Sequence, residues 1–120
     1  MPNILLIEDM PLLRDLLRDA LAGYVCHAVR TAEEGLEILA RVPFDAVITD
    51  VGLPGMGGAE LLRTLRAIRP RTPVIVITGG DEALREEDFI DLGASAYLQK
   101  PFTVDEFMQA VEQALGRRRA

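Results

Sequence analysis

The chain has 120 residues, of which 49% are hydrophobic, with one cysteine and a formal net charge of −6 at pH 7. This length fits one domain, and the apolar share is enough for a core without disulfide or zinc supports. The negative charge argues against binding to nucleic-acid backbones. No segment reaches the roughly 18 to 20 consecutive apolar residues of a membrane span, and a secretory signal pattern is missing at the N-terminus, so we expect a cytoplasmic protein.

Short β-rich runs alternate along the chain with segments of helical spacing. The runs predict strands at five places, in chain order 3–7, 24–29, 45–49, 74–78 and 96–98. The first, third and fourth runs are apolar on both faces, which is typical of central strands in a parallel sheet covered on both sides. Five alternating strand–helix units predict an open parallel α/β sheet with right-handed crossovers and helices on both faces.

Apolar stripes at helical spacing predict the helices between these strands. The first stripe consists of Leu12, Leu13, Leu16, Leu17 and Ala20. The later ones consist of Leu36, Leu39 and Ala40, then Leu61, Leu62, Leu65 and Ile68, and finally Val104, Phe107, Met108, Val111 and Leu115. Thr31 with Glu34, and Thr103 with Glu106, have the form of capping boxes. The segment from Glu82 to Leu92 is rich in acidic residues and has a thin apolar face, so it predicts a poorly anchored helix.

Polar side chains collect where the predicted strands end. Glu8 and Asp9 follow the first run, and Asp50 follows the third. Thr78 ends the fourth run, and Lys100, the only lysine of the chain, follows the fifth. Each residue alone has an ordinary reading as a turn, a helix start or a solvated charge. Because ligands of open α/β sheets bind beyond the carboxyl ends of the strands, their joint placement favours a shared site.

The residue types at this edge suit phosphoryl transfer. Three neighbouring carboxylates repel one another, and oxygen ligands select a hard cation such as Mg²⁺. Asp9 and Asp50 are expected to bind it directly, and Glu8 through a water molecule. A carboxylate can also act as a nucleophile and form an aspartyl-phosphate. Asp50 is then the acceptor, and Lys100 and Thr78 contact the remaining phosphoryl oxygens.

Four motifs along the chain resemble those of the receiver domain of two-component response regulators, in particular the single-domain chemotaxis type. They are ILLIED at 4–9, DVGLPGMGG at 50–58, PVIVITG at 73–79 and GASAYLQKPF at 93–102. The resemblance implies one receiver domain over residues 1–120. It also implies a flavodoxin-like (βα)5 fold whose five parallel strands have the order 2-1-3-4-5.

The resemblance assigns the chemistry of the site. Asp50 is the phosphoacceptor, Glu8 and Asp9 form the acidic pair for Mg²⁺, and the backbone carbonyl of Gly52 completes the metal site. The donor is a histidine kinase or a phosphotransfer protein. The protein is then a phosphorelay signalling switch rather than an enzyme, since it catalyses only its own phosphorylation and autodephosphorylation.

The same resemblance describes a switch. Thr78 is the switch hydroxyl, Tyr97 is the switch aromatic residue, and Lys100 binds phosphate and precedes a cis bond to Pro101. Movement of Thr78 toward a phosphoryl oxygen leaves space that Tyr97 can fill. A downstream protein then reads the change on the fourth helix, fifth strand and fifth helix. We expect no direct nucleic-acid or membrane partner, and a monomer or a weak dimer that depends on phosphorylation.

Glycines depart from the family pattern at informative positions. Gly52 and Gly80 flank the phosphoryl group by the resemblance, and Gly57 stands where an aspartate or asparagine is common. Without side chains at Gly52 and Gly80, water should reach the phosphoryl group more easily, so we expect its faster loss. Added mobility of these loops is an alternative explanation of the glycines.

Other interpretations stay open. The chain can be a receiver excised from a longer regulator or hybrid kinase, a degenerate receiver that only binds partners, or a flavodoxin-like cofactor-binding protein. The acidic loop at Glu8 and Asp9 speaks against a flavin phosphate. His27 and Cys26 are interpreted as ordinary strand residues, and Arg117, Arg118 and Arg119 as a solvated helix end.

Overall fold

A computed structural model describes residues 1–53, 55–80 and 83–116 of the chain. Strands and helices alternate in these residues: β1 Asn3–Ile7, α1 Pro11–Ala20, β2 Val25–Val29, α2 Ala32–Arg41, β3 Ala46–Asp50, α3 Gly58–Ile68, β4 Val74–Thr78, α4 Glu86–Asp91, β5 Ala96–Gln99 and α5 Val104–Ala114. All strand pairs are parallel, in the order β2-β1-β3-β4-β5. This confirms the predicted fold class and strand order. Within the described ranges, no helix has the length and apolar character that crossing a membrane requires.

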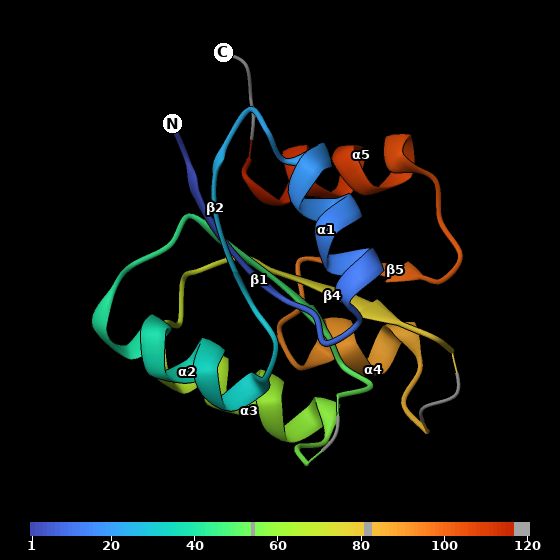
Figure 1. The fold of residues 1–120 in the computed structure, drawn as a ribbon. Helices are drawn as coiled ribbons and strands as arrows, with labels where there is room; N and C mark the ends of the chain where they lie inside the picture. The colour runs from blue at the N-terminus through green and yellow to red at the C-terminus, as the bar shows by residue number, and fades with distance from the viewer. Residues whose placement is uncertain (54, 81–82, 117–120) are drawn as a thin grey trace.

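Helices cover both faces of the sheet (Figure 1). α1 and α5 lie on one face, and α2, α3 and α4 lie on the other. The three central strands β1, β3 and β4 are almost completely buried, whereas the edge strands β2 and β5 are partly exposed. The two-sided apolar runs of the sequence therefore correspond to the centre of the sheet, as expected.

Alternating side chains of the central strands build two separate cores. The core under α2, α3 and α4 contains Leu5, Ile7, Val47, Val74 and Val76 from the strands. The core under α1 and α5 contains Ile4, Leu6, Ile48, Ile75 and Ile77. Gly35 allows α2 to approach the sheet closely, because a Cβ atom there would lie 2.8 Å from Cγ1 of Ile7.

The predicted helix starts are confirmed to different degrees. Thr103 Oγ1 accepts from Glu106 N, and Glu106 Oε1 accepts from Thr103 N, so the capping box of α5 is complete. At α2, Thr31 Oγ1 accepts from the backbone of Glu34 as predicted. The Glu34 carboxylate, however, accepts from the backbone of Arg30 rather than Thr31. The capping box of α2 is therefore only half formed.

Several residues assigned to the buried stripes lie at the surface instead. Leu12 is 85% exposed and Leu16 is 52% exposed, and Ala40 and Val104 are also exposed. In α1 the buried row runs through Leu17, and the neighbouring row of Leu12 and Leu16 faces solvent. Apolar spacing located the helix correctly but overestimated the width of its contact.

α4 is shorter than predicted. It begins at Glu86, after Ala83 and Leu84, and Glu82 lies outside the described residues. Among the residues of this helix, Phe89 alone is buried, while Ile90 is 43% exposed. The expected weak anchoring therefore takes the form of a six-residue helix held by one aromatic side chain.

Candidate functional site

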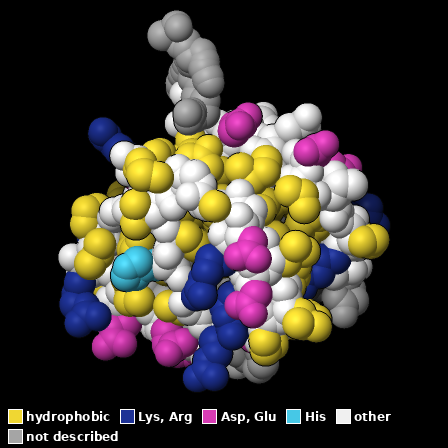
Figure 2. All heavy atoms as spheres, turned by 45° about the horizontal axis from the view of Figure 1, so that its top comes forward, with side chains coloured by type: hydrophobic (Ala, Val, Ile, Leu, Met, Phe, Trp, Pro, Cys, Tyr) yellow, Lys and Arg dark blue, Asp and Glu magenta, His cyan; other side chains and the backbone are white. Residues whose placement is uncertain are grey.

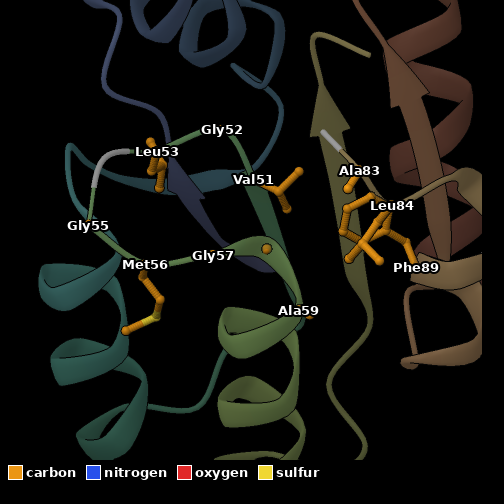
Figure 3. A pocket seen from close by; sticks show the side chains of 11 residues that line it. Val51, Gly52, Leu53, Gly55, Met56, Gly57, Ala59, Ala83, Leu84 and Phe89 are labelled. Carbon is orange, nitrogen blue, oxygen red and sulfur yellow. The ribbon is translucent and has the colours of Figure 1, made fainter. Parts of the chain in front are cut away.

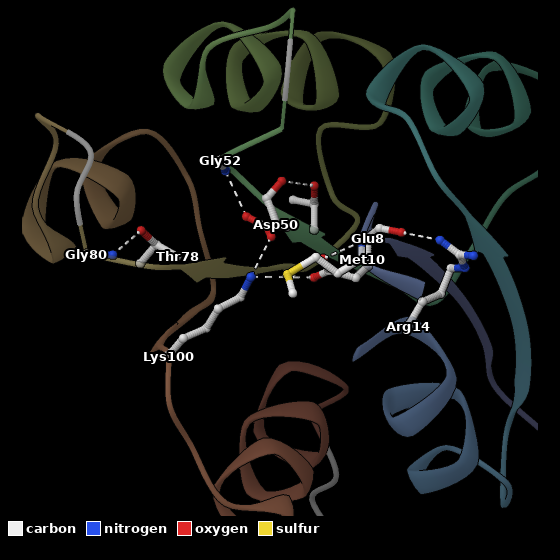
Figure 4. A network of polar contacts seen from close by, with 9 residues as sticks. Glu8, Met10, Arg14, Asp50, Gly52, Thr78, Gly80 and Lys100 are labelled. Atoms are coloured by element: carbon white, nitrogen blue, oxygen red, sulfur yellow. Dashed lines mark hydrogen bonds and ion pairs between the residues drawn. The ribbon is translucent and has the colours of Figure 1, made fainter. Parts of the chain in front are cut away.

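The predicted polar residues meet at the carboxyl edge of the sheet (Figure 4). Glu8 follows β1, Asp50 ends β3, Thr78 ends β4 and Lys100 follows β5. Glu8, Asp9 and Asp50 each offer a carboxylate oxygen, and these oxygens all lie within 4.8 Å of one another. The parallel topology thus brings together residues that are up to 92 positions apart, from Glu8 to Lys100.

Asp50 is held through both of its carboxylate oxygens. Oδ1 accepts from the backbone N–H of Gly52 at 2.8 Å, and Oδ2 accepts from Nζ of Lys100 at 2.7 Å. The residue is only 5% exposed and is the last residue of a completely buried strand. A carboxylate with its oxygens aimed at the rim and its backbone anchored in the sheet is well placed to act as a nucleophile.

Glu8 carries the least favourable charge of the site. The side chain is completely buried, and Oε2 accepts from Met10 N at 3.2 Å. Oε1 has no hydrogen-bond partner among the described residues, although Nζ of Lys100 lies 3.9 Å away. Burial and, to a smaller extent, the negative charge of Asp50 raise the pKa of Glu8 from 4.5 to about 7. A positive charge near Oε1 would relieve this cost.

Lys100 supplies the one ammonium group of the cluster. Burial acts to lower its pKa, but the hydrogen bond to Asp50 and the charges of Asp50, Glu8 and Asp9 act the other way, and the pKa is raised overall. Lys100 therefore stays protonated at neutral pH. With Glu8 ionised, three carboxylates face a single ammonium, so the cluster keeps excess negative charge.

A divalent cation with oxygen ligands fits this donor set. The three carboxylates are close enough to share one ion, Oε1 of Glu8 lacks a hydrogen bond from the described residues, and Asp9 is exposed to solvent. Hard cations such as Mg²⁺ are bound by one or two carboxylates and several waters, which an exposed rim can supply. The acidic cluster is therefore able to hold a metal.

Thr78 and Tyr97 lie on the side of the cluster that faces α4. The Thr78 side chain is buried, and Oγ1 accepts from Gly80 N at 3.0 Å. The half-buried ring of Tyr97 lies 6.0 Å from the ring of Phe89 and packs against the core under α2, α3 and α4. The peptide bond between Lys100 and Pro101 is cis.

Gly80 has a backbone reason to be glycine. Its φ is +86°, in the left-handed region that side chains disfavour. A Cβ atom there would also lie 3.0 Å from Cδ of Gln99. The sequence suggested access of water or added mobility as the role of this glycine, and the contact with Gln99 was missed. The one feature of the sequence that pointed to this contact was the position of Gln99, two residues after Tyr97 and therefore on the same face of β5.

Two hollows lie beside the cluster. An apolar pocket of about 520 Å³ separates the loop after β3 from the start of α4, with Val51, Met56, Leu84 and Phe89 in its wall (Figure 3). A polar groove of about 470 Å³ lies at Gly80, Tyr97 and Gln99 and is bordered by Arg85 and Glu86. The start of α4 is therefore bounded by unfilled space on two sides.

The remaining polar candidates lie away from the cluster. His27, the single histidine, is exposed on the edge strand β2 and is visible at the surface in Figure 2, with its ring 5.9 Å from that of Phe44. Cys26 is half-buried, and burial raises the pKa of its thiol. Arg117, Arg118 and Arg119 lie outside the described residues.

Comparisons with known proteins agree with this architecture. The model of the response regulator receiver domain matches residues 4–112. The response regulator protein FleR of Pseudomonas aeruginosa is 39% identical over 118 residues, which cover 96% of this chain and 25% of FleR. A response regulator receiver domain protein from Clostridium thermocellum has 29% identity and a TM-score of 0.90, with 98% of this chain and 97% of that chain covered.

A further solved structure concerns the metal. The receiver domain of the sensor histidine kinase PA1611 from Pseudomonas aeruginosa, solved with a magnesium ion in its active-site cleft, is 28% identical with a TM-score of 0.83. The match covers 96% of this chain and 98% of that domain.

The chain belongs to the response regulator receiver domain family of two-component signalling. It spans a quarter of the length of FleR and about half the length of other curated regulators that it matches.

Proposed function

We propose that residues 1–120 form one receiver unit in which Asp50 accepts a phosphoryl group from a histidine kinase or a phosphotransfer protein. The observation that supports this most strongly is the double anchoring of the buried Asp50 carboxylate by Lys100 and Gly52 beside Glu8 and Asp9. A structural ion pair alone would not explain three carboxylates at one rim.

The reaction is a displacement at phosphorus. An oxygen of the ionised Asp50 carboxylate attacks, an O–P bond forms, and the bond from phosphorus to the donor breaks with its electron pair staying on the leaving group. From acetyl phosphate the leaving group is acetate, and from phosphohistidine it is an imidazole that takes a proton. Lys100, released from Oδ2 as the aspartate becomes an acyl phosphate, then pairs with a phosphoryl oxygen.

Glu8, Asp9, Asp50 and the backbone carbonyl of Gly52 would hold Mg²⁺. The ion would neutralise part of the charge on the phosphoryl group, which is what metal ions supply in phosphoryl transfer. The raised pKa of Glu8 and the lack of a hydrogen bond on its Oε1 from the described residues support this assignment, because both reflect a need for positive charge. Hydrolysis of the aspartyl-phosphate in the same site would be the protein's own dephosphorylation.

Thr78 and Tyr97 act as the switch. A phosphoryl group adds charge and acceptor oxygens at Asp50, and the Thr78 hydroxyl turns to donate to one of them. Space left behind Thr78 then admits the ring of Tyr97. The single buried anchor of α4 and the two hollows beside it support a change that is confined to this face. A downstream protein reads the new arrangement of α4, β5 and α5.

The donor protein would dock on α1. This helix starts at the rim, directly after the acidic pair, and Met10, Leu12 and Leu16 are 52%, 85% and 52% exposed. Figure 2 brings the layer of α1 and α5 forward and shows hydrophobic side chains among charged ones on its surface. Exposed apolar side chains next to a reactive group favour a protein partner over a free small molecule.

Mass measurement after incubation with acetyl phosphate and Mg²⁺ tests this function. The wild type should gain one phosphoryl mass, while Asp50→Asn and the wild type in EDTA should gain none. Gain of the same mass by Asp50→Asn would show that the acceptor is another residue. No gain in the metal-replete wild type would support the alternative of a receiver that only binds partners.

A further inference from the structure

The side chain of Gln99 fills the space beside Gly80. Gln99 ends β5, and its partner in the neighbouring strand is Thr78. A Cβ atom at Gly80 would lie 3.0 Å from Cδ of Gln99, 3.5 Å from its Cγ, and closer still to its amide nitrogen. The carboxamide of an exposed residue thus takes the place of the side chain that position 80 lacks.

Gly80 is in turn bonded to the switch hydroxyl. Its N–H donates to Thr78 Oγ1 at 3.0 Å, and its left-handed φ of +86° defines the shape of the turn from Thr78 to Gly80. When the Thr78 hydroxyl turns toward a phosphoryl oxygen, this hydrogen bond breaks and the turn loses one of its restraints. The contact with the Gln99 side chain is then a further restraint on this turn.

Gln99 also borders the space next to Tyr97. The two residues are two positions apart on β5 and share one face of the strand. Both line the polar groove of about 470 Å³, together with Gly80, Arg85 and Glu86. Gln99 is therefore in contact with the turn that carries Thr78 and in the same groove as the aromatic residue that responds to it.

We propose that Gln99 is a positioning residue of the switch: its side chain packs against Gly80 and holds the Thr78–Gly80 turn in the resting arrangement. The joint movement of Thr78 and Tyr97 requires this contact to open. Gln99 thereby sets how much of the unphosphorylated protein occupies the signalling arrangement. The inference rests on the phosphorylation switch proposed above and adds the residue that sets its resting balance.

Fluorine NMR of the full chain carrying 3-fluorotyrosine tests this role. The chain has two tyrosines, and Tyr24 packs against the core under α1 and α5, so its signal serves as an internal reference. In unphosphorylated Gln99→Ala, the Tyr97 signal should move toward its position in the phosphorylated wild type. The rate of phosphoryl gain from acetyl phosphate should rise about twofold or more, because a larger fraction of molecules is already competent.

Two further variants test whether the effect comes from packing of the Gln99 side chain against Gly80 or from the loss of any exposed glutamine. Gln99→Met keeps the length and volume of the side chain and should behave like the wild type. Gln109→Ala removes an exposed glutamine of α5 and should also leave both measurements unchanged. An unchanged Tyr97 signal and rate in Gln99→Ala, or equal effects of Ala and Met at position 99, would overturn the proposal.

Failure of this inference can be told apart from failure of the proposed function. If the wild type gains a phosphoryl mass but Gln99→Ala matches it in signal and rate, only the role of Gln99 is wrong. If the wild type gains no phosphoryl mass, the proposed function is wrong. The Tyr97 signals of the two unphosphorylated proteins still report whether Gln99 restrains this face, and identical signals would then also reject the role of Gln99.

Discussion

Nζ of Lys100 lies 2.7 Å from Oδ2 of Asp50, across the end of β4, which separates the strands that carry the two residues. The same ammonium lies 3.9 Å from Oε1 of Glu8. One cation therefore serves two buried carboxylates, and its distance to the second is too long for a hydrogen bond. This unequal sharing leads to the first two predictions.

Replacement of Lys100 should slow phosphorylation without abolishing it. Lys100→Met keeps the length of the side chain but removes the charge that pairs with Asp50 and, later, with the phosphoryl group. Loss of one such donor typically costs about 10² to 10³ in rate. Time courses of phosphoryl gain in saturating Mg²⁺ measure the effect, with Arg63→Met, an exposed cation of α3, as the control. A rate equal to that of the wild type would contradict a catalytic role for Lys100.

The stability of the metal-free protein should fall as the pH rises. Glu8 has a pKa of about 7 when folded and 4.5 when unfolded, so between these values the folded state binds more protons. The contribution of Glu8 to the free energy of unfolding is therefore fully present below about pH 4.5 and is lost as the pH rises to about 7. Above that pH, Glu8 is ionised although it is buried. The shift from 4.5 to about 7 corresponds to about 3 kcal/mol at most.

Urea unfolding in EDTA at pH 5 and pH 8 measures this effect. Glu8→Gln should be more stable than the wild type at pH 8 and should lose the part of the pH dependence that belongs to Glu8. Addition of Mg²⁺ should stabilise the wild type more at pH 8 than at pH 5, since the ion binds the ionised carboxylate. Parallel pH profiles for wild type and Glu8→Gln would argue against a raised pKa of Glu8.

A charge on the exposed face of α1 should block the protein donor selectively. Leu12 is 85% exposed, so Leu12→Asp should change the free energy of unfolding by no more than about 0.5 kcal/mol. Transfer from a phosphorylated histidine kinase or phosphotransfer protein should slow about tenfold or more, while phosphorylation by acetyl phosphate stays unchanged. Val42→Asp, at a 42% exposed position after α2, is the matched control. Equal slowing with the protein donor and with acetyl phosphate would show that Leu12→Asp acts on the phosphorylation site rather than on docking of the donor protein.

A side chain at Gly52 should prolong the life of the phosphorylated state. Gly52→Asn should hinder water at the aspartyl-phosphate and lengthen the half-life about twofold or more, measured by the decay of the phosphoryl mass. The change is made at position 52 alone, since a side chain at Gly80 meets both a left-handed φ and Gln99. Gly57→Asn is the control, because a Cβ there meets no atom within 4 Å. An unchanged half-life in Gly52→Asn would favour mobility as the role of this glycine.

Most of the fold was predictable because its central strands differ so clearly from its edges. The runs at β1, β3 and β4 are apolar on both faces, and such runs are typical of a parallel sheet in which helices bury both faces. Once the topology is known, Glu8, Asp50, Thr78 and Lys100 must share an edge, which is why residues far apart in sequence could be assigned to one site.

What the sequence could not supply depends on contact geometry rather than on pattern. Leu12 and Leu16 fit the helical spacing of a core row, yet the buried row of α1 runs through Leu17 and leaves them in solvent. The start of α4 was placed too early, because the acidic segment before Glu86 has no apolar period that marks a boundary. The strand pattern places Gln99 on the face of Tyr97, but its contact with Gly80 also depends on the path of the turn after β4, where Gly80 has a φ of +86°.

The dependence of α4 on Phe89 has a consequence for how such a protein diversifies. The core under α1 and α5 draws residues from all five strands and contains no residue of α4. The hydrogen bonds and ion pairs of Glu8, Asp50 and Lys100 among the described residues involve no residue of α4, so substitutions on its outer surface leave these contacts in place. The specificity for downstream partners can therefore change through substitutions in one short helix, while the residues that carry out phosphoryl transfer stay the same.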